Sequence, residues 1–277
     1  MIARCGWLLV VVLVSACSGP GHPALPGVPD GQSVRHINVG GLDRIYRLYR
    51  PEGLPASAAL VVMLHGGFGS AAQAERSYGW DSLADSAKFV VAYPDGVSRA
   101  WNVGGCCGQP AKENIDDVGF INAVVADVRA GIGIDPRRVY ATGMSNGGMM
   151  AFALACNSGT FAAIGPVSAT QLSCPNPRPI SVMHIHGTAD PMIRYDGGEG
   201  IGFARINGPP VLDVDASWRK VDQCGPPTVT TNGGVSTSTA TCPDNRAVVL
   251  STVEGGGHDW PPFATTALWQ FFAAHAR

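Results

Sequence analysis

Two uninterrupted apolar segments stand out in the pattern of hydrophobic and polar positions, residues 59–64 and 89–93. Strands that are buried on both faces of a parallel sheet have this continuous apolar character, whereas half-exposed strands alternate. Further strands are expected at 138–142, 161–167, 180–185 and 247–253. Two earlier β-rich stretches, 33–39 and 44–50, flank a short glycine-containing turn and predict an antiparallel hairpin at the edge of the sheet.

Helical segments alternate with these strands. Residues 117–130 place Ile121, Val124 and Val128 on one face of a helix, which is the amphipathic period of an α-helix. Other helices are expected at 71–78, 81–87, 147–156 and 265–274. Strand–helix alternation implies right-handed crossovers between parallel strands. The pattern therefore predicts an open α/β fold in one domain, residues 31–277, with a surface hairpin in the Thr/Ser-rich segment 228–241.

The first residues resemble an export signal. An apolar run of eight residues, 7–14, is too short to span a bilayer but suits the core of a signal peptide. It ends in Val14-Ser15-Ala16-Cys17, which resembles the lipobox of bacterial lipoproteins, where the Cys is acylated and begins the mature chain. We expect a signal peptide at 1–16, a lipid on Cys17 and a flexible tether at 17–30, and the alternative is an ordinary signal peptide with an incidental Cys. The predicted location is the extracellular side of the cell membrane, with part of the protein secreted.

Charge and composition exclude several classes of protein. The chain has 19 basic and 21 acidic residues, a formal net charge of −2 and no basic cluster, so nucleic-acid binding has no electrostatic basis. A hydrophobic content of 45% excludes a disordered chain. We also expect the protein to be a monomer that contacts the membrane through the lipid on Cys17.

Six of the eight cysteines lie outside the signal peptide and the lipobox: Cys106, Cys107, Cys156, Cys174, Cys224 and Cys242. An even number of cysteines in an exported protein predicts disulfides. Zinc is the alternative, but the chain has no Cys-x-x-Cys pair, and the adjacent Cys106 and Cys107 fit one tetrahedral ion poorly. We therefore expect disulfides and no metal.

The strongest chemical motif is Gly143-Met144-Ser145-Asn146-Gly147, which follows a predicted strand and opens a predicted helix. A Gly-x-Ser-x-Gly turn in this context is typical of a nucleophile elbow, which lifts the serine hydroxyl above the end of the sheet. The helix N-terminus then supplies amide groups and partial positive charge near a developing oxyanion. A glycine-rich turn that happens to contain serine is the alternative.

A serine nucleophile needs a base, and the base needs an orienting acid. Asp190 follows the strand 180–185 and lies 45 residues after Ser145, and His258 follows the strand 247–253 and lies 68 residues after Asp190. This is the chain order Ser, Asp, His of α/β-hydrolases. Taken singly, Asp190 could be a capping residue and His258 a surface residue. We interpret the nearby His186 as a brace for the acid loop, and we regard a metal site at His184 and His186 as the weaker interpretation.

The segment after the first buried strand, His65-Gly66-Gly67-Phe68, resembles an oxyanion loop whose backbone N–H acts together with that of Asn146. The sequence leaves open whether Gly67 or Phe68 is the donor. The overlapping segment Gly67-Phe68-Gly69-Ser70-Ala71-Ala72 fits a Gly-x-Gly-x-x-Ala dinucleotide motif, with Asp95 as the acid that would bind the ribose. That alternative leaves the three residues of the predicted triad unexplained.

Together these motifs resemble the polyhydroxybutyrate depolymerase and feruloyl esterase-like family of α/β-hydrolases, and most closely its lipobox-bearing actinobacterial Lpq esterases. The resemblance extends over most of the mature chain and rests on Leu64–Gly67, Trp101-Asn102, Cys106–Gly108, Asp116–Phe120, Ile134–Tyr140, Gly143–Gly148, His186–Pro191 and Gly256–Pro261. It implies an α/β-hydrolase fold and an exported carboxylic-ester hydrolase with catalytic Ser145, Asp190 and His258 and no cofactor.

The resemblance has further implications for the cysteines and the substrate. It implies the local pairs Cys156–Cys174 and Cys224–Cys242, which leaves Cys106 with Cys107. The substrates that it implies are 3-hydroxybutyrate-type, feruloyl or acetyl esters. Trp101 and Trp260 flank the predicted site, and they either stack on an acyl group or a sugar or serve in ordinary packing. A catalytically inactive binding protein of the envelope is the alternative function.

Overall fold

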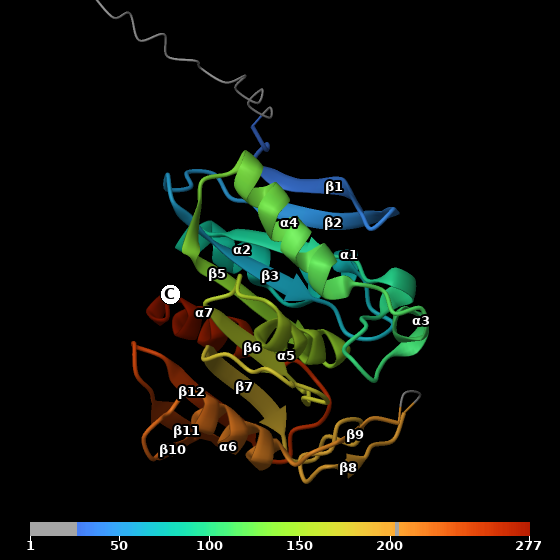
Figure 1. Cartoon of the computed structure of the whole chain (residues 1–277). Coiled ribbons are helices and arrows are strands. Elements are labelled where there is room, and N and C mark those ends of the chain that lie inside the picture. The colour runs from blue at the N-terminus through green and yellow to red at the C-terminus, as the bar shows by residue number, and fades with distance from the viewer. Residues whose placement is uncertain (1–26, 203–204) are drawn as a thin grey trace, which may run out of the picture.

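The computed structural model describes residues 27–202 and 205–277, and a ten-stranded sheet runs through it (Figure 1). The strand order is β1-β2-β4-β3-β5-β6-β7-β12-β11-β10. The strands are β1 Gly31–Val39, β2 Leu42–Arg50, β3 Ala58–Leu64, β4 Val90–Pro94, β5 Ile134–Met144, β6 Ala163–Val167, β7 Ser181–Gly187, β10 Thr228–Asn232, β11 Val235–Thr241 and β12 Ala247–Val253. The neighbouring strands β4, β3, β5, β6, β7 and β12 are parallel to one another. The strands at the two edges, β1 and β2 on one side and β11 and β10 on the other, pair in antiparallel fashion. The predicted mostly parallel sheet and its N-terminal edge hairpin are confirmed.

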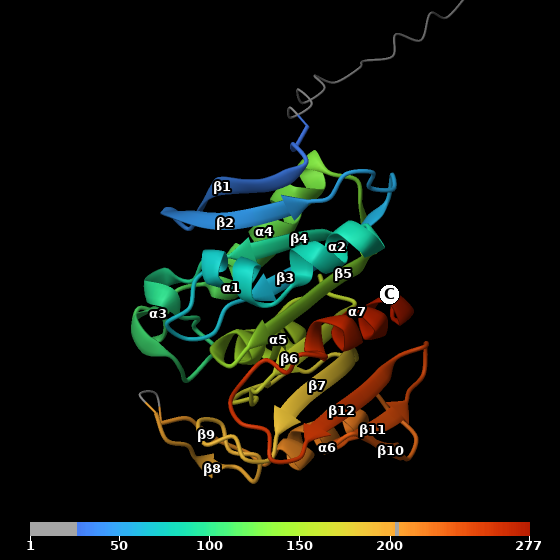
Figure 2. The ribbon, with the colours of Figure 1, turned by 180° about the vertical axis from the view of Figure 1, so that it is seen from behind.

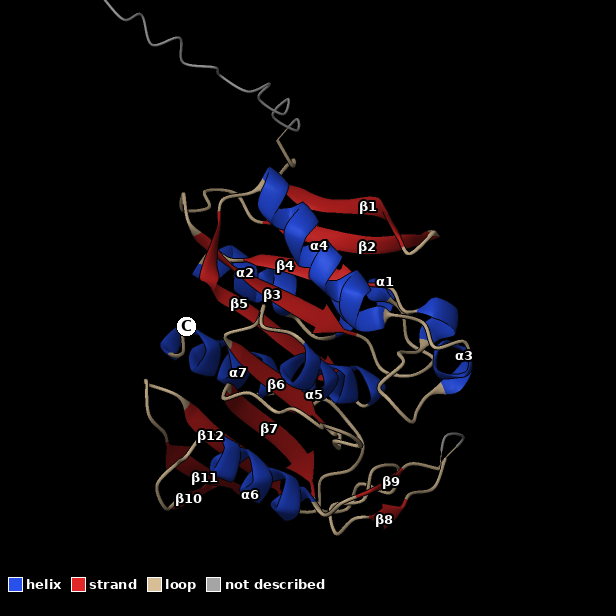
Figure 3. Ribbon diagram, in the orientation of Figure 1, coloured by secondary structure: helices blue, strands red, loops and turns tan. Residues whose placement is uncertain are grey.

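Helices cover both faces of this sheet, as the colouring by secondary structure makes clear (Figure 3). One face, seen in Figure 1, carries α4 Asp117–Gly131, α5 Asn146–Asn157 and α6 Val211–Val221. The opposite face, seen in Figure 2, carries α1 Ala71–Ser77, α2 Trp80–Ala87 and α7 Ala264–Ala274. Two groups of buried apolar side chains fill the spaces between the sheet and the two helix layers. The short elements η1 Val97–Arg99, α3 Gly108–Lys112, β8 Gly198–Glu199 and β9 Asn207–Gly208 belong to the connecting loops.

The central strands and the long helix α4 follow directly from the local sequence. Every residue of β3 and of β4 is buried, as their continuous apolar character predicted. In α4, Asp116 caps the N-terminus, because its Oδ1 accepts a hydrogen bond from Gly119 N–H at 2.7 Å. The predicted apolar face of this helix, which includes Ile121, Val124 and Val128, is buried against the sheet.

The Thr/Ser-rich segment forms the predicted hairpin, β10 with β11. Strand β11 also pairs with β12, so the hairpin extends the central sheet instead of standing apart from it. All residues of β10 are exposed, because this strand is the edge of the sheet.

The domain begins earlier than the sequence predicts. Val28 is 7% exposed and belongs to the core, and Asp30 forms an ion pair with Arg50. The prediction of a flexible tether up to residue 30 is therefore wrong at its end, because an apolar side chain in the last part of the segment packs on the domain. The signal peptide at 1–16, the lipidated Cys17 and most of the tether lie outside the described residues. In the part of the chain that the structure describes, no helix is long and apolar enough to cross a membrane.

Three disulfides link the six remaining cysteines. Cys156 pairs with Cys174, Cys224 pairs with Cys242, and the adjacent Cys106 and Cys107 pair with each other. The pairings implied by the family resemblance are confirmed. The first bridge ties the last turn of α5 to the loop that leads toward β7.

Candidate active site

The predicted nucleophile, acid and base meet at one edge of the sheet. Ser145 follows β5, Asp190 follows β7 and His258 follows β12. These three strands are parallel, so the loops at their carboxyl ends lie at the same edge. In open α/β sheets, this edge is where functional groups collect.

Ser145 stands on a sharp turn between β5 and α5. Its backbone has φ 56° and ψ −121°, a conformation that residues other than glycine rarely adopt. A Cβ atom on Gly147 would lie 2.3 Å from Leu64 O, and one on Gly143 would lie 2.5 Å from Gly147 O. The glycines on either side are therefore required by the close approach of backbone to backbone, which accounts for the Gly-x-Ser-x-Gly spacing.

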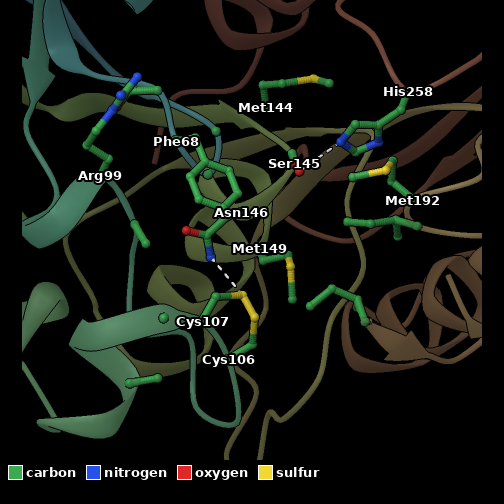
Figure 4. A pocket seen from close by; sticks show the side chains of 18 of the residues that line it. Phe68, Arg99, Cys106, Cys107, Met144, Ser145, Asn146, Met149, Met192 and His258 are labelled. Carbon is green, nitrogen blue, oxygen red and sulfur yellow. Dashed lines mark hydrogen bonds between the residues drawn. A yellow bond between two sulfur atoms is a disulfide. The ribbon is translucent and has the colours of Figure 1, made fainter. Parts of the chain in front are cut away.

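A chain of hydrogen bonds joins the three side chains. Ser145 Oγ lies 2.9 Å from His258 Nε2 (Figure 4), and His258 Nδ1 in turn lies 2.8 Å from Asp190 Oδ2. With Nδ1–H donating to the carboxylate, Nε2 carries the lone pair that faces the serine hydroxyl. The side chain of Asp190 is fully buried, whereas that of His258 is 17% exposed. The imidazole is thus held in one orientation at the boundary between core and solvent.

The carboxylate of Asp190 is held in its charged form. Burial raises the pKa of Asp190, but hydrogen bonds from His258 and from Ile193 N–H outweigh burial and lower it below the usual value. Its Oδ1 accepts from Met192 N–H at 2.8 Å and from Ile193 N–H at 2.9 Å. Both oxygens of the carboxylate are therefore occupied, and its position is fixed by its own loop.

Two buried histidines support this loop from behind. His186 Nε2–H donates to Ile193 O at 2.8 Å, and the same Nε2 lies 3.4 Å from Asp190 Oδ2. His186 Nδ1 lies 3.1 Å from His184 Nε2. The interpretation of His186 as a brace for the acid loop is confirmed by these contacts. Burial lowers the pKa of both imidazoles, so both are neutral near pH 7.

The loop after β3 turns tightly beside the serine. Gly69 N–H donates to Gly66 O, and Phe68 N–H donates to Arg99 O at 2.8 Å. Phe68 is therefore wrong as an oxyanion donor, because its amide is already used. A Cβ atom on Gly67 would lie 3.9 Å from Asn146 Cβ, so Gly67 and Asn146 are neighbours. Gly67 remains as the donor from this loop.

His65 holds the same loop in place. Its Nδ1–H donates to Gly66 O at 2.8 Å, and its Nε2 accepts from Gly96 N–H at 2.9 Å. The ring is completely buried, and burial lowers the pKa of His65. A neutral imidazole of fixed tautomer thus joins the loop after β3 to the loop after β4.

The side chain of Asn146 makes contacts that the sequence did not indicate. Its Oδ1 accepts from Trp101 N–H at 2.7 Å, and its Nδ2 donates to Trp101 O at 3.2 Å. Nδ2 also lies 3.5 Å from Cys107 Sγ. Asn146 therefore fixes the Trp101–Cys107 segment to the start of α5, next to the serine.

A pocket of about 1040 Å³ opens above Ser145 and His258. Apolar and sulfur-containing side chains form much of its wall, as the close view shows (Figure 4). They include Phe68, Tyr78, Cys106, Cys107, Met144, Met149, Leu172, Met192, Ile193, Ile201 and Ile206. This volume and lining suit an organic molecule that places a bond next to Ser145 Oγ.

Both tryptophans predicted to bind substrate pack elsewhere. Trp101 is completely buried, its Nε1–H donates to His65 O at 2.9 Å, and its ring centroid lies 4.8 Å from that of His65. Trp260 packs on Tyr78 with ring centroids 4.6 Å apart, and its Nε1–H donates to Thr265 Oγ1. Among the described residues that line the pocket, neither tryptophan is present, so the prediction of substrate contacts is wrong. Both side chains are used for packing behind the pocket.

The alternative ligands find little support. Within residues 27–202 and 205–277, no group of three or more His, Cys, Asp or Glu side chains could hold a metal ion. Asp95, the ribose-binding acid of the dinucleotide interpretation, instead accepts a hydrogen bond from Ala71 N–H at the start of α1. Because this carboxylate already holds the start of α1, the dinucleotide interpretation loses its ribose-binding acid.

Comparison with known proteins gives an independent result. The model of the family described as "Esterase PHB depolymerase" matches residues 44–198. NocK of Nocardia uniformis subsp. tsuyamanensis, which is named as a candidate esterase, is 33% identical over 317 residues, which cover 94% of this chain and 90% of NocK. Feruloyl esterase B of Piromyces equi is 30% identical over 226 residues, which cover 73% of this chain but 40% of that protein.

Among solved structures, an acetyl xylan esterase from Aspergillus awamori has the same fold. Its TM-score is 0.68 at 16% identity, over 87% of this chain and 99% of that chain. At this identity the likeness bears on the fold alone. The expected α/β-hydrolase fold is confirmed.

Proposed function

Because this chain belongs to the esterase PHB depolymerase family and is a carboxylic-ester hydrolase, we propose that it uses Ser145 as nucleophile, His258 as general base and Asp190 as orienting acid. The observation that carries this proposal is the unbroken chain of hydrogen bonds from Ser145 Oγ through His258 to the buried carboxylate. The strained backbone of Ser145, which points its hydroxyl at the pocket, supports the same roles.

The first half of the reaction transfers the acyl group to the enzyme. Ser145 Oγ attacks the ester carbonyl carbon while its proton passes to His258 Nε2. Asp190 stabilises the imidazolium that forms, since its carboxylate is charged and 2.8 Å from Nδ1. The imidazolium then gives its proton to the leaving alkoxide, which departs as the alcohol and leaves an acyl-enzyme on Ser145.

Two backbone amides are placed to stabilise the oxyanion. Asn146 N–H lies at the first turn of α5, where unpaired amides and the helix dipole favour negative charge. Gly67 N–H lies beside it, and within the described residues this amide has no other hydrogen-bond acceptor. His65 keeps the Gly67 loop in position through its bond to Gly66 O.

The second half of the reaction uses water in place of the alcohol. His258 takes a proton from a water molecule, which attacks the acyl carbonyl, and then returns a proton to Ser145 Oγ. The products are a carboxylic acid and the free enzyme. We infer that the esters are of the 3-hydroxybutyrate, feruloyl or acetyl type, because the pocket has room for an acyl group larger than acetyl and is largely apolar.

Kinetics on a panel of such esters test the proposal. Ser145→Ala should lower kcat on a short-chain ester by about 10⁴-fold or more while the protein stays folded, because oxyanion donors and binding supply only a residual rate. Ser86→Ala, an exposed serine on α2, is the matched control and should keep the wild-type rate. A Ser145→Ala variant that still turns over the panel would refute the assignment. If wild-type protein binds these esters but turns none of them over, the alternative of an inactive binding protein is correct.

We further propose that the enzyme is exported and held at the extracellular side of the membrane as a monomer by lipid on Cys17. An apolar run of eight residues is too short to anchor the chain, so retention then depends on the acyl chains, each worth about 0.8 kcal/mol per buried CH₂. Cys17→Ser should abolish labelling by radioactive palmitate and release active enzyme into the medium. Wild-type protein that carries no lipid and is removed from membranes by salt would contradict the lipid anchor.

A further inference from the structure

The charged residues that line the pocket are all basic. The chain has more acidic than basic residues, 21 against 19, yet no Asp or Glu is among the described residues that form the pocket wall. Arg99, Lys112 and Arg205 line it, and they come from three separate segments of the chain. The pocket is therefore strongly biased toward positive charge in a protein that is slightly acidic overall.

Arg99 is fixed next to the oxyanion loop. Its Nε–H donates to Gly69 O at 3.1 Å, and its carbonyl oxygen accepts from Phe68 N–H. Both Ser98 and Arg99 have positive φ, 49° and 62°, a conformation that is costly for residues other than glycine. In the view of Figure 4, Phe68 lies between Arg99 and Ser145. The strained backbone therefore lies where an exposed arginine joins the pocket wall.

Lys112 is the second cation of the wall and lies at the end of α3, which follows the Cys106–Cys107 bridge. Its side chain is exposed, as is that of Arg99, and within the described residues neither forms an ion pair with a carboxylate. Arg205 differs, because its guanidinium lies 3.4 Å from Glu199. Arg99 and Lys112 are therefore the two cations whose charge is available to a ligand.

We propose that the esters that this enzyme hydrolyses best carry an anionic group, such as a carboxylate, which Arg99 and Lys112 attract to the opening of the pocket. This inference rests on the proposed function, since it names the substrate class of the same site. Unpaired cations at a cleft with apolar walls raise the local concentration of anions and speed their association. Acids beside the pocket, which would cancel this effect, are missing from the described part of its wall.

The size of the effect follows from Coulomb's law. At a separation of about 8 Å, one cation changes the affinity for an anion by a factor of about 2 in bulk water and by more where the effective dielectric constant is lower. Removal of one of the two cations should therefore lower kcat/KM for an anionic ester by about 3- to 10-fold relative to a neutral ester. Screening should weaken the preference, because the Debye length falls from about 30 Å at 0.01 M salt to about 8 Å at 0.15 M.

Pairs of esters that differ in one charge provide the test. For the alcohol part, 4-acetoxybenzoate is anionic and 4-acetoxybenzamide is its neutral counterpart. For the acyl part, mono-4-nitrophenyl adipate is anionic and 4-nitrophenyl hexanoate is neutral. The measured quantity is the ratio of kcat/KM for the anionic ester to that for the neutral ester, which removes differences in enzyme concentration and in general activity.

Four variants compare the effect of charge inside and outside the pocket. Arg99→Gln and Lys112→Gln should each lower the ratio for at least one pair by about 3- to 10-fold, and Arg99→Lys should restore most of it. Arg129→Gln, an exposed residue on α4 outside the pocket wall, makes the same change in net charge and should leave the ratio unchanged. Lys112→Gln is informative even if Arg99→Gln disturbs the oxyanion loop, because Lys112 lies on a different segment.

The outcomes of these measurements distinguish a failure of the anionic preference from a failure of the proposed function. A ratio that falls in both pocket variants, keeps its wild-type value in Arg129→Gln and decreases with added salt supports the inference. If both members of each pair are hydrolysed through Ser145 but the ratio is the same in all variants, the anionic preference is refuted and the proposed function stands. If neither member of any pair is hydrolysed, the proposed function itself fails.

Discussion

The buried histidine pair behind the Asp190 loop should make stability depend on pH in a way that one substitution isolates. His184 is 2% exposed, and burial together with the neighbouring His186 holds the pKa of His184 well below the usual 6.5. His184→Gln keeps an amide N–H where Nε2 lies, so the contact with His186 Nδ1, 3.1 Å in the wild type, can persist. Glutamine does not titrate, so the pH dependence of the variant lacks the proton uptake of this one group.

The sign and the size of the effect follow from proton linkage. Between pH 6.5 and its lower folded-state pKa, His184 is neutral in the folded protein and protonated in the unfolded chain. The unfolded state then binds more protons, so the free energy of unfolding falls as the pH falls, by about 1.4 kcal/mol per pH unit for one group. As the pH falls from 6.5 toward 5, the wild type should therefore lose more of its free energy of unfolding than His184→Gln does. His186, Asp190 and His258 are present in both proteins, so the difference between the two reports mainly on His184.

Urea unfolding followed by tryptophan fluorescence provides the assay, since Trp80, Trp101 and Trp218 are fully buried. Near pH 7.5 the variant should be less stable than the wild type by about 1–3 kcal/mol, because an aromatic ring is lost from a buried site. The gap should close as the pH is lowered to about 5. His36→Gln removes an exposed imidazole and reports any effect that does not require burial. Parallel curves for wild type and His184→Gln across this range would show that His184 does not take up a proton on unfolding.

Three further substitutions test other parts of the structure. Asp190→Asn should lower kcat by about 10⁴-fold with little change in KM, measured by steady-state kinetics on a short-chain ester, because the imidazolium loses its charged partner; a loss below 10-fold would contradict the role of the acid. The double variant Cys156→Ala/Cys174→Ala opens a loop whose ends are 18 residues apart, which raises the conformational entropy of the unfolded chain. Its free energy of unfolding in urea titrations should fall by about 3 kcal/mol, and an unchanged value would contradict this loop-closure contribution. Gly147→Ala puts a Cβ atom 2.3 Å from Leu64 O and should reduce the melting temperature and the activity together, so a stable, active variant would show that the turn is not constrained as described.

Much of the sheet could be predicted from the sequence because its signals are local. Strands β3 and β4 are continuous apolar runs, and the order Ser145, Asp190, His258 places one polar residue after each of three predicted strands. Parallel strands bring such residues to one edge whatever the details of packing. Once the three strands were predicted correctly, the three triad residues could be expected to lie close together.

Helix α6 shows a signal that the sequence contained but that was missed. Val211, Val214, Trp218 and Val221 recur at helical spacing after Pro210, and the first three of them are buried. The acidic and basic residues between them weaken the apolar pattern. A search for helical periodicity within this mixed segment would have found the helix.

The pocket wall could not be predicted, because it depends on contacts between distant segments. The burial of Trp101 depends on the ring of His65 and on the side chain of Asn146, which lies 45 residues away. The choice of Gly67 over Phe68 depends on the carbonyl of Arg99, a residue in a separate loop. No local pattern encodes contacts between such distant segments, so the sequence could not decide whether the two tryptophans contact the substrate or serve in packing.

Covalent labelling shows directly whether Ser145 is the nucleophile. A fluorophosphonate reacts with an activated serine, so incubation with the wild-type enzyme followed by intact-mass analysis and peptide mapping identifies the nucleophile. We expect one phosphonyl group per chain, located on Ser145, with labelling absent in Ser145→Ala and strongly slowed in His258→Gln. A label on any other serine, or ester turnover by a wild-type enzyme that resists labelling, would contradict it.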